Sequence, residues 1–273
     1  MDFRVTHDYI VIPRETIAEI SARYHRIVRA VNRKFWYSES DRDHCLYVGS
    51  YGRGTAIVTS DIDMLVEIPV EQRYRFSSYS GNGQSQFLQA VKDAITKAYP
   101  KSEIMADGQV VKVDFREGMK FEVLPAFSVD RRGKAVYEYP DTNMGGHWKT
   151  TNPKAEQQEI GIKDRLSNGL LRETCRQIRA LRAKAYPGRR VSGIMVDSFV
   201  YLAIGGWKFQ SEYARNLNWR QYWQALLDCY NSITSHGSHH PDLQAPGSEM
   251  KVDKPEGWDV LGKILSRMAW EGL

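Results

Sequence analysis

Apolar residues recur every three or four positions along several long stretches of the chain, a spacing that predicts amphipathic helices. The clearest stretch opens at Pro13 and ends at Phe35. Its apolar positions are Ile17, Ile20, Tyr24, Ile27, Val28, Val31 and Phe35. We expect this helix to form a spine that joins two lobes. A second stretch predicts a helix over 86–99 that Pro100 ends. Its inward positions are Phe87, Leu88, Val91 and Ile95.

Shorter apolar runs and alternating patterns predict strands in the first half of the chain. Residues 45–48 indicate a short buried strand, and the apolar run around Asp61 indicates a second. A hairpin over 109–124, with its turn at 116–118, follows because polar and apolar residues alternate on both sides of that turn. Between these strands, the Ser- and Gly-rich residues 75–84 predict a mobile loop.

The second half of the chain has a different character. Residues 128–151 are rich in polar and turn residues, and the pattern beyond them is helical, starting where Asn152 can cap a helix at Pro153. The spacing predicts helices over 153–167, 170–186, 193–206, 218–235 and 257–270. We expect their core to contain Trp207, Trp219, Trp223, Trp258 and Trp270. These patterns favour an α+β protein with a sheet lobe over 1–150 and a helical lobe over 151–273.

Composition narrows the function classes. The three cysteines, Cys45, Cys175 and Cys229, are isolated in the sequence, which argues against a disulfide framework and favours a reducing compartment. No stretch reaches the roughly 18 apolar residues of a membrane span, and no signal peptide is visible, so we expect a cytoplasmic protein without a membrane partner. The net charge of +5 suits nucleic acid or nucleoside triphosphates. Because no run of Lys or Arg exceeds two residues, we rank small nucleotides above polymeric nucleic acid.

The most informative segment is the run GSYGRGTAIVTSDIDMLVEI, which begins at Gly49. Its glycines let the backbone turn so that N–H groups point at a phosphate, and Ser50 adds a hydroxyl donor. Asp61 and Asp63 are two residues apart on a predicted strand, so both side chains project from one face. Such carboxylates repel each other, which predicts at least one raised pKa without a metal, and they are the hard ligands that magnesium prefers. This combination indicates a metal-dependent nucleotidyl-transfer site.

This run resembles the signature of the cGAS/DncV-like nucleotidyltransferases, bacterial enzymes that make cyclic oligonucleotide signals for anti-phage defence. The runs KFEVLPAF at 120–127 and WKTTNP at 148–153, with a basic helix and a Ser-aromatic helix after them, extend the resemblance over about residues 14–205. The resemblance implies a polymerase-β-like lobe with a mixed sheet, packed on an oligoadenylate-synthetase-like helical lobe. It also implies that the site lies in the cleft between the lobes.

The resemblance implies the parts of this site as well. Asp61, Asp63 and a third carboxylate bind two Mg²⁺, for which Mn²⁺ can substitute. Gly49 and Ser50 hold the donor triphosphate of the NTP substrates. Arg179 contacts the triphosphate at a position where Lys is more usual, and Ser198 contributes to nucleotide binding.

The identity of the third carboxylate is open between two residues. The matching position holds Glu122, where Asp is common, and Asp114 is the alternative. The predicted hairpin brings Lys112 near Glu122 and Asp114 near Lys120, so two surface ion pairs are the plainer interpretation of these residues. We favour Glu122 because its strand continues as the resembled pattern implies.

Other candidate groups also have plainer explanations. Arg172, Arg176 and Arg179 form one basic stripe, which is either a phosphate-binding surface or a solvated helix face. The candidates for base binding are Tyr137, Tyr139, Trp148, Ser198 and Tyr201. Packing in the core is the commoner role for each of these aromatic residues. The cluster His236, His239 and His240 lacks a cysteine pair, so loop polarity explains it better than a zinc site does.

The function that the resemblance implies is the condensation of NTPs into a cyclic di- or trinucleotide messenger that a separate effector protein reads. Three alternatives stay open. A template-free polymerase would make linear oligonucleotides, and a related transferase would modify tRNA or protein. The third alternative, a nucleotide-binding scaffold, would have no catalytic activity.

Overall fold

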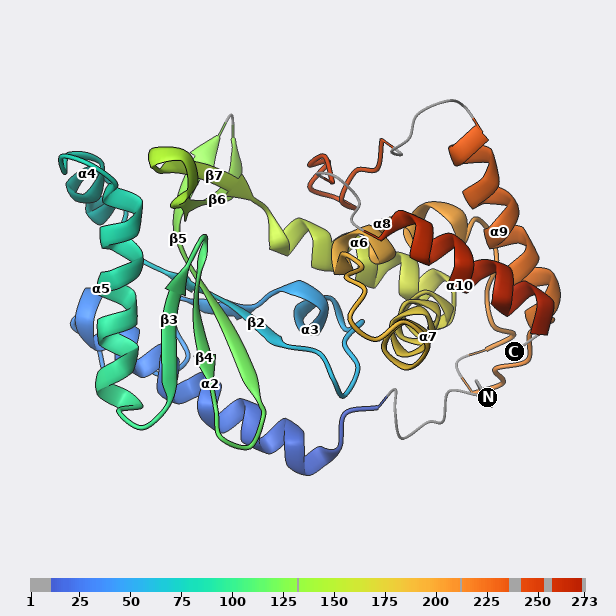
Figure 1. The fold of residues 1–273 in the computed structure, drawn as a ribbon, viewed down its shortest axis with the longest axis horizontal. Helices are drawn as coiled ribbons and strands as arrows, with labels where there is room; N and C mark the ends of the chain where they lie inside the picture. Colours follow the sequence, from blue (N-terminus) through green and yellow to red (C-terminus); the bar gives the residue numbers. More distant parts are fainter. Residues whose placement is uncertain (1–10, 132, 212, 236–241, 253–256, 272–273) are drawn as a thin grey trace. The chain divides into compact units, whose positions relative to one another are not determined.

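The computed structural model describes residues 11–131, 133–211, 213–235, 242–252 and 257–271. It divides into two compact units, whose elements are drawn in Figure 1. The sheet unit consists of Pro13–Gly52 and Asp61–Asn152, and the helical unit contains Arg53–Ser60 and Pro153–Leu273. The short segment Arg53–Ser60 therefore belongs with the helices, although both of its neighbours in the sequence belong to the sheet unit.

A mixed sheet of seven strands forms the centre of the sheet unit, which confirms the predicted α+β class. Five strands lie side by side in the order β1 (Cys45–Tyr47), β2 (Ile62–Glu67), β5 (Lys120–Arg131), β4 (Val110–Asp114) and β3 (Glu103–Asp107). Only the pairing of β2 with β5 is parallel among these neighbours. The sheet continues from the second half of β5 into β6 (Lys134–Asp141) and then β7 (His147–Thr151).

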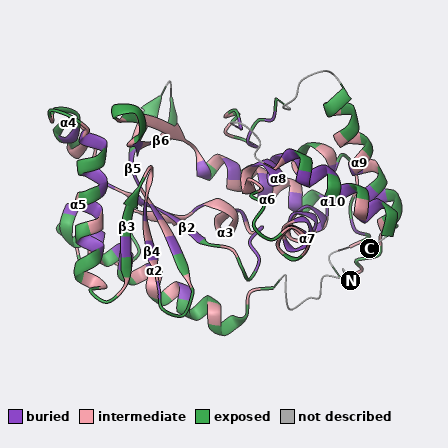
Figure 2. Ribbon diagram, in the orientation of Figure 1, coloured by how far each residue is buried: buried purple, intermediate pink, exposed green. Residues whose placement is uncertain are grey.

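Two long helices cover one face of this sheet. The helices α2 (Arg14–Phe35) and α5 (Gly83–Ala98) pack against each other, with α2 against β2 and α5 against β3 and β4. Buried and exposed residues alternate along α5, as Figure 2 shows. The apolar spacing of these helices therefore matches the prediction, and α5 starts three residues earlier than expected. The cause is Asn82, whose side chain accepts a hydrogen bond from Ser85 N at 2.9 Å and caps the helix.

Three parts of the sheet unit differ from the sequence prediction. A helix, α4 (Glu71–Ser77), occupies part of the segment that was predicted as a loop. The strands β3, β6 and β7 were not predicted, because their residues do not form clean apolar runs. The glycine-serine turn opens a short helix, α3 (Gly49–Arg53), which is followed by an extended segment before β2.

The helical unit contains all five helices that the spacing predicted. They are α6 (Pro153–Leu166), α7 (Leu170–Ala185), α8 (Gly193–Ala203), α9 (Trp219–Ser235) and α10 (Trp258–Glu271). Asn168 and Gly169 both have positive φ and end α6, as expected, with Gly169 N donating to Asp164 O at 2.8 Å. Trp223 and Trp258 are buried in the core, and Trp207 and Trp219 pack at its edge. Trp270 was wrongly expected in this core: it is 84 % exposed.

No helix in the described part of the chain is long and apolar enough to cross a lipid bilayer.

Candidate functional site

Asp63 and Glu122 lie directly across from each other on neighbouring strands. They are Cα partners in the parallel pairing of β2 with β5, so both side chains leave the same face of the sheet. The residues next to them in sequence, among them Met64 and Val123, are completely buried on the opposite face. Asp61 comes two residues before Asp63, and its charge acts on Glu122. The structure therefore brings the three predicted carboxylates to one region of the sheet unit.

Gly49 and Asp63 are in close contact. A Cβ atom added to Gly49 would lie 1.8 Å from Asp63 Oδ2, and the φ of Gly49 is +57°, so only glycine fits here. The backbone adds a second connection, because Val48 N donates to Asp63 O at 2.9 Å. Ser50 is the next residue of α3. The predicted phosphate-binding turn and the predicted metal ligand are thus adjacent.

Two carboxylates of this region, Asp61 and Glu122, have raised pKa values. Burial raises the pKa of Asp61, with Lys120 opposing and Asp114 adding to the shift. Burial also raises the pKa of Glu122, and the charge of Asp61 is the next cause. The expectation of at least one raised pKa is confirmed, but burial contributes more than repulsion between the carboxylates. A divalent cation would relieve both causes.

The hairpin has the register that the alternation predicted. Lys112 pairs with Glu122 and Asp114 with Lys120 across β4 and β5. Asp114 Oδ2 lies 3.9 Å from Lys120 Nζ, which is the surface pair of the plainer interpretation. Lys112 Nζ lies 2.6 Å from Asp107 Oδ2 on β3, and its charge also acts on Glu122.

The donor set suits magnesium in kind, because all three candidate ligands are carboxylates. Among the residues that the structure describes, no three acidic, histidine or cysteine side chains form a ready-made cage for an ion. The carboxylates Asp61, Asp63 and Glu122 therefore share a region without enclosing a closed site. The cluster at His236, His239 and His240 lies outside the described residues.

In the helical unit, the basic stripe of α7 binds the segment Arg53–Ser60 and is not a solvated helix face. Arg172 Nε donates to Arg53 O at 3.0 Å, and Arg176 Nη2 donates to Gly54 O at 2.6 Å. Arg179 Nη2 donates to Asp197 Oδ1 at 2.6 Å and to Gly193 O at 2.9 Å. Contact between Arg179 and a phosphate stays a prediction. Sequence reasoning gave no role to Asp197, although it stands directly beside the candidate Ser198.

Ser198 lines a hollow of about 510 Å³ in the helical unit. Its Oγ is buried and has no hydrogen-bond partner among the described residues. The hollow also contains Tyr201, whose hydroxyl donates to Glu159 Oε2 at 3.2 Å. Asp242 and Glu249 add two more carboxyl groups to the lining. An acidic lining suits a base or hydroxyl group better than a triphosphate.

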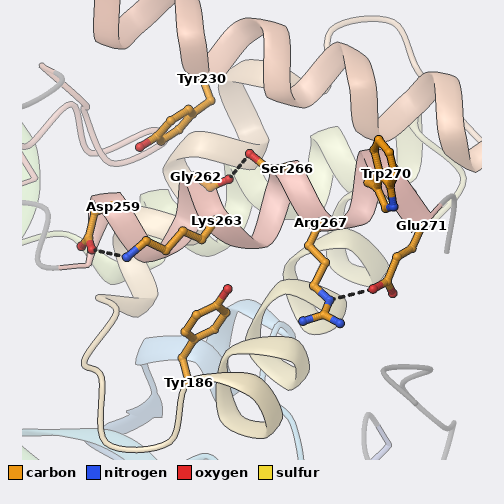
Figure 3. A pocket seen from close by; sticks show the side chains of 9 residues that line it. All are labelled: Tyr186, Tyr230, Asp259, Gly262, Lys263, Ser266, Arg267, Trp270 and Glu271. Atoms are coloured by element: carbon orange, nitrogen blue, oxygen red, sulfur yellow. Dashed lines mark hydrogen bonds and ion pairs between the residues drawn. The ribbon is translucent and has the colours of Figure 1, made fainter. Parts of the chain in front are cut away.

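A second hollow, of about 690 Å³, lies along α10 and contains none of the predicted site residues. Figure 3 shows its charged side chains pairing with one another along the helix. Lys263 Nζ lies 3.4 Å from Asp259 Oδ2, and Arg267 Nε donates to Glu271 Oε1 at 2.8 Å. The sequence analysis predicted no catalytic or binding role for the residues that line this hollow.

The aromatic candidates for base binding pack inside the sheet unit. Tyr137 is buried in an apolar cluster, and Tyr139 packs at the edge of that cluster. Trp148 lies against Phe87 and Phe127, with ring centroids 5.8 and 5.3 Å away, and its Nε1 donates to Ser77 Oγ. Packing is therefore the observed role of all three.

Comparison with known families gives one match. The model of the family described as Second Messenger Oligonucleotide or Dinucleotide Synthetase domain matches residues 2–163, more than half of the chain. A search of the curated proteins found no match to this chain.

Comparison with solved structures shows a shared fold at low sequence identity. The Elizabethkingia meningoseptica CdnE cyclic dinucleotide synthase, solved with GTP and Apcpp, has a TM-score of 0.64 at 13 % identity, covering 94 % of this chain and 90 % of its own. The Rhodothermus marinus CdnE c-UMP-AMP synthase, solved with Apcpp and Upnpp, has a TM-score of 0.62 at 15 % identity, covering 97 % and 94 %. A mutant of the Vibrio cholerae di-nucleotide cyclase DncV has a TM-score of 0.66 at 11 % identity, covering 97 % and 86 %.

Proposed function

We propose that this chain condenses nucleoside triphosphates into a cyclic oligonucleotide. The premise is that the chain belongs to the family of Second Messenger Oligonucleotide or Dinucleotide Synthetase domains. One observation supports this most strongly: the Asp63 carboxylate lies against Gly49 of the predicted phosphate-binding turn and across from Glu122 on the neighbouring strand. This arrangement puts groups suited to a phosphate beside groups suited to a cation.

The carboxylates Asp61, Asp63 and Glu122 would hold Mg²⁺, with Mn²⁺ as a substitute. Such ions, when bound, offset the negative charge on the attacking and leaving oxygens of a nucleotidyl transfer. The chain's own contribution is to orient the donor, because the backbone at Gly49 and the hydroxyl of Ser50 can hold its phosphates next to Asp63. Nucleotide-binding roles for Arg179 and Ser198 stay predictions.

We place the product in the class of cyclic di- or trinucleotides. Two of the similar structures, from Elizabethkingia meningoseptica and Rhodothermus marinus, are described as cyclic dinucleotide and c-UMP-AMP synthases, which supports this class. The product would act through a separate effector protein in anti-phage defence.

Incubation with all four labelled NTPs tests the proposed activity. The protein is given Mg²⁺ or Mn²⁺, and the product is then treated with phosphatase. We expect a phosphatase-resistant product, because a cyclic oligonucleotide has no terminal phosphate. Nucleases that are selective for 2′–5′ or 3′–5′ linkages would then define the bonds.

The double variant Asp61→Ala/Asp63→Ala is the blank for this assay and should make no product, because it lacks two of the three carboxylates. A product that loses terminal phosphates to phosphatase would identify a linear oligonucleotide synthase instead. Absence of product from the unmodified protein with every metal and NTP combination would contradict the proposal.

A further inference from the structure

The segment Arg53–Ser60 joins the two halves of the predicted site. It follows Ser50 by three residues, and Asp61 comes directly after it. Both halves belong to the sheet unit, whereas this segment groups with the helical unit. Loops of this length are commonly mobile unless side chains fix them. What fixes this segment therefore bears on the geometry of the site.

Asp197 is the centre of the contacts that hold the segment. It lies on α8 and is completely buried. Its Oδ2 accepts hydrogen bonds from Arg53 Nε at 2.8 Å and from Thr55 Oγ1 at 2.9 Å. Its Oδ1 accepts from Arg179 Nη2 at 2.6 Å. One carboxylate thus joins two residues of the segment to an arginine of α7.

Further groups of the helical unit complete this arrangement. Glu156 Oε2 on α6 pairs with Arg53 Nη1 at 3.0 Å, and both side chains are nearly inaccessible. The arginines at 172 and 176 hold the carbonyls of Arg53 and Gly54, as described above. Ile57 is buried against Ala180 of α7. Three helices therefore fix the side chains, the backbone and the apolar contact of one short segment.

Arg53 pairs with both Asp197 and Glu156, and Arg179 pairs with Asp197. Burial alone would raise the pKa of Asp197, but the charges of Arg179 and Arg53 outweigh it, and the pKa lies below its usual range. Asp197 is therefore ionised and permanently paired at neutral pH. The Asp197 carboxylate is the counter-ion of Arg179. Pairing with Asp197 is therefore enough to explain why position 179 carries a positive charge.

A buried ion pair contributes little net stability compared with apolar packing of the same volume, because both charges lose their hydration. Its distinguishing property is geometry, since the hydrogen bonds of a carboxylate and two guanidinium groups have fixed directions. Most of the hydrogen bonds described above involve residues 53–55. If the cluster served only the stability of the helices, no contact to this segment would be needed.

We infer that Asp197 is a positioning residue, which fixes Arg53 and Thr55 and thereby the chain on both sides, from Gly49 and Ser50 to Asp61. The inference rests on the proposed function. Asp197 touches neither substrate nor metal in this account. Its loss should therefore lower the rate of the chemical step more than the binding of NTP.

The variant Asp197→Asn tests this role, because it keeps the shape and removes the charge that two arginines share. We expect kcat to fall by about 10- to 100-fold, because a small misplacement of reacting groups lowers the rate by about this factor. KM should change by no more than about threefold. Hydrogen exchange should become faster at residues 49–63 and stay unchanged in α9 and α10. Thr55→Val is a milder change, because it keeps the Asp197 charge and deletes only the hydroxyl that donates to Asp197 and accepts from Arg179 Nη2. It should move both readouts in the same direction by less.

Leu261→Ala is the matched control for lost stability. Leu261 is completely buried in the helical core and is not part of this cluster. The control should lower the melting temperature while leaving kcat and the exchange of residues 49–63 unchanged. An equal loss of kcat in Leu261→Ala and Asp197→Asn at matched stability would overturn the inference. A fall confined to the binding of NTP would overturn it as well.

The exchange measurement separates this inference from the proposed function. If the unmodified protein makes no product, the proposed function fails and the positioning role is judged by exchange alone. Faster exchange at residues 49–63 in folded Asp197→Asn or Thr55→Val then supports the role. Unchanged exchange in both folded variants refutes it.

Discussion

At the scale of single residues, the candidate site is made of groups that do not stabilise the folded protein. Gly49 has a positive φ, which only glycine adopts without strain. The Asp63 carboxylate occupies the space where a side chain at position 49 would lie. Asp61 and Glu122 are buried enough to raise their pKa. A protein that needed only a stable sheet would place apolar or neutral side chains here. These residues are better explained by a ligand than by stability.

The substitution Gly49→Ala should destroy activity. The added Cβ would overlap Asp63 Oδ2, so the carboxylate and the turn must move apart. A shift of this size at a reacting centre lowers the rate by about 100-fold or more. The measurement is the NTP condensation assay, together with a thermal unfolding curve of the variant.

Gly118→Ala separates this clash from backbone strain. Gly118 has a φ of +86°, and nothing lies within 4 Å of a Cβ placed there. Both substitutions therefore carry the strain of an alanine with positive φ, about 1–2 kcal/mol, but only one displaces Asp63. Gly118→Ala should keep its activity. If both variants lost activity equally, contact between Gly49 and Asp63 would not be the reason.

The sequence showed which residues belong to this region better than it showed which residues they contact. Asp61, Asp63 and the turn at Gly49 follow from local spacing, which a sequence shows directly. The position of Glu122 across from Asp63 depends on a parallel pairing between strands that are more than fifty residues apart in the chain. The contacts of Asp197 depend on the packing of three helices. No local pattern encodes either of them.

At the scale of elements, helices with a strong apolar stripe were predicted within a few residues. The predicted helices at 14–35 and 86–99 correspond to α2 and α5, because one of their faces packs in the core. The strand β7 lies at the edge of the sheet and contains no buried residue. The strand β6 lies between β5 and β7, and its buried residues do not alternate regularly with exposed ones. Trp270 shows the opposite error, because a large apolar residue at helical spacing can still face solvent.

The substitution Asn82→Ala should destabilise the sheet unit. The Asn82 side chain caps α5 by accepting from Ser85 N, and its amide donates to Thr142 O at 2.8 Å. Loss of a cap and a second hydrogen bond should lower the free energy of unfolding by about 1–2 kcal/mol. Urea unfolding measures this change.

Ser85→Ala is the matched control for the cap. Ser85 contributes its backbone N–H to the capping bond, and alanine keeps that group. The free energy of unfolding should therefore stay within about 0.5 kcal/mol of the original value. Equal losses in the two variants would mean that Asn82 does not act as a cap.

At the scale of the whole molecule, the chain passes between its two units four times. The passages follow Ile12, Gly52, Ser60 and Asn152. The predicted boundary at residue 150 lies two residues before the last of them and stays a prediction. The second and third enclose the eight residues Arg53–Ser60 within the signature run. They were not predicted, because the apolar pattern of that segment is too short to show which core it joins.

The proposed function depends most on the binding of divalent cations by Asp61, Asp63 and Glu122 beside a nucleoside triphosphate. Mn²⁺ binding followed by electron paramagnetic resonance, with a non-hydrolysable ATP analogue present, tests it most directly. We expect two Mn²⁺ per chain in the unmodified protein, as a two-metal site requires. Asp63→Asn and Glu122→Gln should each bind fewer, whereas Asp114→Asn should still bind two.

Retention of two Mn²⁺ in Glu122→Gln and their loss in Asp114→Asn would make Asp114 the third ligand. Cation binding by these carboxylates would be contradicted if the unmodified protein bound no more Mn²⁺ than the analogue binds alone, or if Asp63→Asn titrated like the unmodified protein.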